Sequence, residues 1–187
     1  MKDKFLMLSS AMILSVGLLI GCGTDKIEET EAVQTEQTGE VSTEVAGGLT
    51  FELPKGFKAD ETTQGLYVPE VKEDGDFSCI YYQEALRDER FSLLTEDKIA
   101  ELMEEIYEEM YGIDTEVTVN DFYRFSLDGY TAYKIETTFA KEEQVVKMTE
   151  FVVESGEKSF SVTYMLMEGS SWETAFENSA DTLKVSE

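Results

Sequence analysis

The feature that most constrains the fold is a set of four segments of alternating residues in the second half of the chain. Val, Thr, Phe and Tyr recur there at about 115–127, 130–139, 144–154 and 159–167. Such β-branched and aromatic residues favour strands. Asp128-Gly129 separates the first two segments, and this dipeptide is typical of a two-residue hairpin turn. The sequence therefore predicts an antiparallel meander of four strands.

Three further strands are expected upstream, at about 49–53, 65–71 and 77–83. The second and third are joined by the acidic loop Glu73-Asp74-Gly75-Asp76. This loop lacks the alternating oxygen ligands and the closing Glu of an EF-hand loop, and Asp-Gly is common in hairpins. We therefore interpret the loop as a turn and not as a calcium site.

Two segments have helical spacing. The longer runs from Thr95, a suitable N-cap, to about Tyr111, and Gly112 follows it. Its apolar stripe consists of Ile99, Leu102, Met103, Ile106 and Met110. A shorter helix near the C-terminus begins with Ser170-Ser171-Trp172-Glu173, which has the spacing of a capping box. The expected fold class is α+β, with an antiparallel sheet of about six or seven strands and two helices.

The N-terminus has the pattern of an export signal. Lys2 and Lys4 precede an almost uncharged run from 5 to 20, as in a secretory signal peptide. The run ends in Leu19-Ile20-Gly21-Cys22, which resembles a bacterial lipobox. That resemblance implies that Cys22 carries a diacylglycerol and that the mature chain begins there. The alternatives are an ordinary signal peptide with an incidental cysteine, or a retained anchor helix.

These features divide the chain into three parts. Residues 1–21 are expected to be a lipoprotein signal peptide. Residues 22–48 comprise the lipidated Cys22 and an acidic tether rich in Thr, Glu and Gly, which has too little apolar surface to fold. Residues 49–187 are long enough for one globular domain. Two or more acyl chains, such as palmitate, hold a protein stably on a membrane, so we expect this domain at the extracytoplasmic face of the cell membrane.

The composition excludes several kinds of function. The formal charge is −25, and it becomes about −26 when Lys2, Asp3 and Lys4 leave with the signal peptide. Such a chain repels phosphates, so no nucleic acid partner is expected, and cations or basic protein surfaces are favoured. The chain has no histidine, which removes Ser/His/Asp and Cys/His catalysis and His-ligated zinc. Cys79, the second of two cysteines, is interpreted as a buried structural residue. No cofactor is expected.

The long helix carries an acidic face. Its members recur at three- and four-residue spacing and are Asp97, Glu101, Glu104, Glu105 and Glu108. Each like-charged neighbour at this spacing costs a helix about 0.2–0.5 kcal/mol. The face is a candidate surface for a basic envelope protein or for weakly held divalent cations. The alternative is a solvated face in a protein that is acidic throughout.

Two catalytic patterns are weaker. Ser155-Gly156-Glu157-Lys158 matches the S-x-x-K of penicillin-binding enzymes, but it is expected in a hairpin turn and its supporting motifs are absent from the sequence. Paired carboxylates can serve a glycosidase, but 40 acidic residues produce many chance pairs. We interpret both patterns as accidental.

The order of the elements resembles that of a known family. The segments "FELPKGFK", "DGYTAYKIETTF", "SFSVTYML" and "WETAFENSADTLKV" are similar to the PsbP-like family, which includes bacterial lipoproteins of the DcrB type. The resemblance covers nearly all of residues 49–187. It implies a central antiparallel sheet with helices on both faces, no enzyme activity, and a role as an accessory module on a larger assembly. No ligand position of the family can be matched to a residue of this chain.

Three functions are thus distinguished by the sequence. The first is a non-catalytic binding or accessory module, anchored to the membrane through Cys22 and contacting an envelope protein. The second is a lipoprotein that binds a small ligand or a divalent cation in a cleft or on the acidic helix. The third is a hydrolase that uses carboxylates alone.

Overall fold

A computed structural model describes residues 47–71, 76–87, 93–111, 116–141 and 144–186. The signal peptide, Cys22, the tether and most of the acidic loop at 73–76 lie outside these residues. Within the described part of the chain, no helix is long and apolar enough to cross a membrane.

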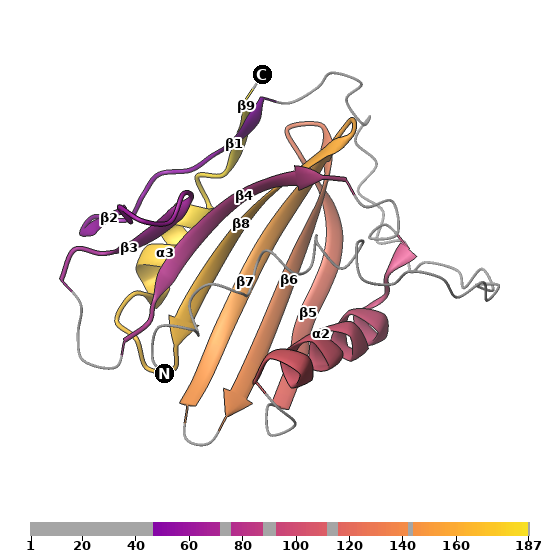
Figure 1. Ribbon diagram of the computed structural model, residues 1–187. Helices are drawn as coiled ribbons and strands as arrows, with labels where there is room; N and C mark the ends of the chain where they lie inside the picture. Colours follow the sequence, from indigo (N-terminus) through magenta and orange to yellow (C-terminus); the bar gives the residue numbers. More distant parts are fainter. Residues whose placement is uncertain (1–46, 72–75, 88–92, 112–115, 142–143, 187) are drawn as a thin grey trace.

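The centre of the molecule is a seven-stranded sheet in which every neighbouring pair is antiparallel. Its strands are β2 (Phe57–Ala59), β3 (Leu66–Pro69), β4 (Cys79–Leu86), β5 (Glu116–Leu127), β6 (Tyr130–Lys141), β7 (Gln144–Ser155) and β8 (Lys158–Met167). The order across the sheet is β2-β3-β4-β8-β7-β6-β5. The predicted meander of β5 to β8 is confirmed, and its last strand pairs with β4 (Figure 1).

The two helices lie on opposite faces of this sheet (Figure 1). α2 (Glu96–Tyr111) packs mainly on β5, and α3 (Glu173–Ala180) lies on the other face. Ile99 of the predicted apolar stripe is buried. The expected α+β class, an antiparallel sheet between helices, is therefore confirmed.

The predicted capping box of the short helix is wrong. Trp172 occupies the N-cap position and no side chain caps α3. Ser170 instead accepts a hydrogen bond from the Trp172 backbone N–H at 3.3 Å, and its hydroxyl donates to Asp76 at 3.2 Å. The Ser170 hydroxyl therefore links Trp172, at the start of α3, to Asp76 and does not form the predicted capping box.

A second, two-stranded sheet joins the ends of the described chain. β1 (Gly48–Thr50) pairs with β9 (Lys184–Ser186), and neither strand belongs to the central sheet. The edge strand predicted at 49–53 is thus shorter and pairs elsewhere, while β9 was not predicted. A strand of three residues is too short to show alternation of polar and apolar residues in the sequence. Such a strand is recognised only from its pairing with a distant segment.

The hairpin between β5 and β6 forms as its sequence predicts. Asp128 has a φ of 50° and Gly129 a φ of 87°, as a two-residue hairpin turn with two positive φ values requires. Lys158 pairs with Ser155 across the β7–β8 turn, so the S-x-x-K pattern lies in a hairpin, where it was expected, and does not open a helix.

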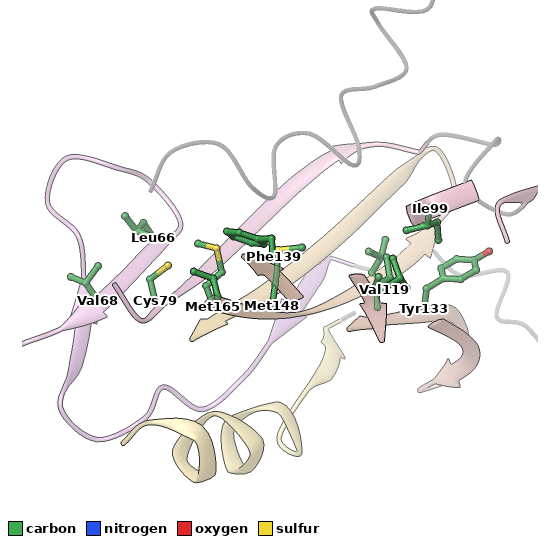
Figure 2. Close-up of a cluster of buried hydrophobic side chains, with 12 residues drawn as sticks. Leu66, Val68, Cys79, Ile99, Val119, Tyr133, Phe139, Met148 and Met165 are labelled. Atoms are coloured by element: carbon green, nitrogen blue, oxygen red, sulfur yellow. The ribbon is translucent and has the colours of Figure 1, made fainter. Parts of the chain in front are cut away.

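Hydrophobic side chains cover both faces of the sheet. The cluster on the α2 face comprises Leu66, Val68, Cys79, Ile99, Val119, Tyr133, Ile135, Phe139, Val146, Met148, Val152 and Met165. Figure 2 shows it extending along the sheet from Leu66 and Val68 to Ile99 of α2. The cluster on the α3 face is richer in aromatic residues and includes Phe57, Tyr130, Phe160, Tyr164 and Phe176. Cys79 is fully buried, as predicted.

Candidate functional site

The candidate site begins with the alternation of β8. Phe160, Val162 and Tyr164 belong to the hydrophobic cluster on the α3 face. Successive side chains of a strand point to opposite faces, so Ser159, Ser161 and Thr163 point to the α2 face. All three are at most 1% exposed, because β8 is a central strand between β4 and β7. A row of small hydroxyl side chains therefore lies inside the protein.

Neighbouring strands add two larger polar groups to this row. Gln83 of β4 is paired with Ser161, and Glu150 of β7 is paired with Thr163. Directly paired residues share a face of the sheet. The five side chains, which we call the Glu150 cluster, are Gln83, Glu150, Ser159, Ser161 and Thr163.

Six oxygen atoms of the Glu150 cluster are buried without a hydrogen-bond partner in the structure described here. They are both carboxyl oxygens of Glu150, Oε1 of Gln83 and the three hydroxyl oxygens. Buried polar groups are nearly always hydrogen-bonded, and leaving one unpaired costs about 1–3 kcal/mol. This concentration on one part of one face makes the region the candidate functional site.

Glu150 is the one ionisable residue of the cluster and is 0% exposed. Desolvation by burial raises its pKa from 4.5 to about 8. The hydroxyls of Ser161 and Thr163 lie near enough to oppose this rise in pKa. Neither of them meets hydrogen-bond geometry with the carboxyl group, so desolvation dominates. At neutral pH the carboxyl group is therefore largely protonated and able to donate a hydrogen bond.

Glu154, two residues further along the same face of β7, is in a different environment. Arg87 Nη2 lies 3.4 Å from its Oε2, and the Tyr133 hydroxyl donates to the same oxygen at 3.5 Å. Burial raises the Glu154 pKa, while the positive charges of Arg87 and Arg124 oppose the rise. Burial and the adjacent Glu154 charge together raise the Tyr133 pKa to about 12. Glu154 thus has cationic partners, whereas Glu150 has none of this kind among the described residues.

The chemistry available to the Glu150 cluster is binding by hydrogen bonds and charge. Its oxygens can accept hydrogen bonds from a donor-rich ligand, and an ionised Glu150 can compensate one positive charge. No group of three or more Cys, Asp or Glu side chains in the described residues is arranged to hold a metal ion.

The acidic face predicted on the long helix is separate from this cluster. Asp97, Glu101, Glu104 and Glu105 are exposed on α2. Glu108 belongs to α2, but its side chain lies outside the described part, as does the whole of Cys22. Lys98 Nζ lies 2.7 Å from Glu101 Oε2, and the last turn of α2 has no basic residue. The exposed acidic residues are available to a partner but do not meet Glu150.

The sequence analysis did not select Glu150, although a signal for it exists. Along β7, Val146, Met148 and Val152 are buried on one face, and Glu150 falls at the same alternation. A charged residue at a core position of a strand is unusual. Glu150 is one of 40 acidic residues in the chain. The sequence alone does not show which faces of β7 are covered, so it did not distinguish Glu150 from the exposed ones.

Comparison with known proteins identifies the fold. No protein-family model matches the chain, and no curated protein sequence matches it. Among solved structures, the cyanobacterial PsbP (CyanoP) of Synechocystis sp. PCC 6803 superposes with a TM-score of 0.55 at 14% sequence identity. The match covers 74% of this chain and 86% of that chain. The fold is PsbP-like.

A second structure is similar to a lesser degree. This structure is LpqN of Mycobacterium tuberculosis, described as involved in cell envelope biogenesis. It superposes with a TM-score of 0.44 at 11% sequence identity, and the match covers 74% of this chain and 83% of the LpqN chain. The superposition on the cyanobacterial PsbP confirms the PsbP-like fold expected from the sequence, and the comparisons do not single out a family of the DcrB type.

Proposed function

We propose that this protein is a lipid-anchored, non-catalytic accessory or binding module at the extracytoplasmic face of a cell membrane. The observation that carries the proposal is a PsbP-like domain in a chain that begins with a lipobox-like segment ending at Cys22. Export and lipidation would fix the domain near a membrane, and the acidic segment from 23 to 48 would hold it at a distance from the bilayer.

The exposed acidic side of α2 supports a protein partner with a basic surface. Glu104 and Glu105 are exposed, and no ion pair is found for either within the described structure. Such charges accelerate association with a basic partner and specify its orientation more than they increase affinity. Anionic lipid head groups are repelled by the same charge.

Cross-linking in intact cells tests the proposal. The native protein and a Cys22→Ala form are cross-linked in parallel, and the products are identified by mass spectrometry. We expect one dominant envelope protein that is lost or strongly depleted in the untethered form. Absence of any partner above background in both forms would contradict an accessory role.

Charge reversal then tests the surface. Glu104→Lys with Glu105→Lys should reduce the yield of the cross-linked partner severalfold, because both changes place positive charge on the α2 face. Glu168→Lys with Glu177→Lys is the matched control, since both residues are exposed and neither belongs to α2. Equal loss in the two double variants would show that net charge alone matters.

A second function, a small-ligand lipoprotein, is favoured by the Glu150 cluster. An accessory role does not explain six unpaired oxygens inside a domain. The two functions do not exclude each other, because the cluster is internal and the α2 face is external.

A further inference from the structure

We propose that the Glu150 cluster binds the primary ammonium group of a small organic cation. This site goes beyond the accessory role and does not depend on it. The argument uses the placement of the oxygens, the cost of burying them, and the side chains around them.

The cluster presents acceptors from three adjacent strands to one region. Thr163 and Ser161 of β8 lie between Glu150 on one side and Gln83 on the other. All six unpaired atoms are oxygens. An alkylammonium group has three N–H donors and no acceptor. The cluster and this group are therefore complementary in hydrogen bonding.

Charge supplies the second step. A buried carboxylate without a cation is strongly unfavourable, and a carboxyl in this position holds a proton instead. Glu154 on the same strand forms an ion pair with Arg87. Glu150 has no such cation among the described residues. An ammonium group at Glu150 would take the place of both the proton and the absent counter-charge.

The surroundings favour an organic cation over a metal ion. Along β7, Glu150 lies between Met148 and Val152 on the same face, and its partner on β6 is Ile135. These apolar side chains suit a hydrocarbon stem. Calcium and magnesium sites use several charged or strongly polar oxygens, whereas the cluster has one carboxylate. Complete burial of the cluster also favours a small ligand over a side chain of a partner protein. Entry of the ligand requires local opening of this face of the sheet.

Binding should release a proton, because the carboxyl must ionise to pair with the ammonium group. Other titratable or charged groups on this face are Glu154, Tyr133, Arg87 and Arg124 near one end, and Tyr81 opposite Thr163 on β4. The charged residues described on α2 are exposed. Tyr133 keeps its proton because its pKa is about 12. Glu154 already faces Arg87, so Glu150, which would contact the ammonium group, is the expected source of the proton released between pH 6 and 7.5.

The test is isothermal titration of the full-length protein, in mild detergent and 300 mM salt, with putrescine and with ethanolamine. Salt screens association with the acidic surface but not with a buried site. We expect saturable binding with release of about one proton, measured by comparing buffers of different ionisation enthalpy. The affinity should rise up to tenfold per pH unit between pH 6 and 7.5. Tetramethylammonium, which has no N–H donor, and potassium should bind at least tenfold more weakly.

Two variants make the result decisive. Glu150→Gln has the shape of the protonated acid and should abolish both the saturable binding and the proton release. If this variant fails to fold, Thr163→Val, which removes one hydroxyl and keeps the side-chain shape, should weaken binding severalfold. Glu104→Gln is the control for loss of one surface charge and should bind normally.

Three outcomes would overturn the proposal. They are unchanged binding in the Glu150 variant, equal binding of tetramethylammonium or potassium, and absence of saturable binding at 300 mM salt. None of them bears on the cross-linking of an envelope partner, so failure of this site and failure of the accessory role are distinguishable.

Discussion

At the residue scale, Glu150 and Glu154 show how position on one strand decides the chemistry of a carboxyl group. Both lie on the α2 face of β7 and both are buried. Arg87 and Tyr133 contact Glu154, whereas the groups nearest Glu150 are small hydroxyls. Burial raises the pKa of both carboxyl groups, but the positive charges of Arg87 and Arg124 oppose the rise only at Glu154.

Replacement of Glu150 by Gln should change how stability depends on pH. The folded-state pKa is about 8 and the unfolded value is 4.5. Between these values the folded protein holds a proton that the unfolded chain releases, so the free energy of unfolding falls as pH rises. Urea unfolding at pH 5 and pH 8 should show a fall that is smaller in Glu150→Gln than in the native protein, by an amount on the order of 2–4 kcal/mol.

A surface variant serves as the reference for this experiment. Glu104→Gln removes an exposed charge from α2 and should keep the pH dependence of the native protein. If Glu150→Gln and Glu104→Gln gave the same difference between pH 5 and pH 8, the folded-state pKa of Glu150 would not be raised.

At the element scale, the junction of β3 and β4 contains a close backbone approach that only glycine permits. Gly65 precedes β3 with a φ of 79°, and its carbonyl oxygen accepts a hydrogen bond from the Tyr82 N–H at 2.8 Å. A Cβ atom on Gly65 would collide with the Tyr82 carbonyl oxygen. Gly169 has the same φ of 79°, but a Cβ there would meet nothing within 4 Å.

Comparing alanine variants at these two glycines distinguishes the cost of a positive φ from the cost of a collision with the Tyr82 carbonyl oxygen. Gly169→Ala should cost about 1–2 kcal/mol, the cost of a left-handed conformation with a side chain. Gly65→Ala should cost about 3 kcal/mol or more, because the β3–β4 junction must also shift. Chemical denaturation of both variants measures the difference, and equal losses would argue against a collision at Gly65.

The β5–β6 hairpin turn also connects two sheets. Asp128 Oδ2 accepts a hydrogen bond from the Val185 N–H of β9 at 2.8 Å, and Asp128 itself has a positive φ. Asp128→Ala should destabilise the protein by about 1–2 kcal/mol, because it loses the acceptor and a residue that tolerates this backbone conformation.

Asparagine is the matched substitution at this turn. Asp128→Asn retains an acceptor oxygen and tolerates a positive φ, so its free energy of unfolding should stay within about 0.5 kcal/mol of the native value. Amide exchange at Val185 should accelerate in the alanine variant alone. Similar exchange rates in both variants would show that the Asp128 side chain does not stabilise β9.

At the scale of the whole molecule, the proposed tether and anchor decide where the domain works. Cys22→Ala should abolish labelling with palmitate and move the protein from the membrane fraction to the soluble or secreted fraction, because the lipid is the proposed attachment. Cys79→Ala is the control, since Cys79 is buried in the sheet and should not affect labelling. Labelling that persists without Cys22 would refute lipidation at that residue.

The sequence by itself determined the elements with local signals. Alternating residues predicted β5 to β8, Asp128-Gly129 predicted their first turn, and helical spacing predicted α2. Each of these signals lies within a short window, where backbone conformation and side-chain periodicity are set by neighbouring residues. The PsbP-like arrangement was expected from the resemblance of the element order and of short hydrophobic segments to that family.

Only the tertiary structure decided which polar residues are inside. Pairing of β8 with β4 and β7 buries Ser159, Ser161 and Thr163, and the register of β7 brings Glu150 to them. Pairing of β1 with β9 and the contact of Ser170 with Asp76 likewise join segments far apart in the chain. Burial and long-range pairing depend on strand order, which local periodicity does not encode, and for that reason the Glu150 cluster emerged from the fold alone.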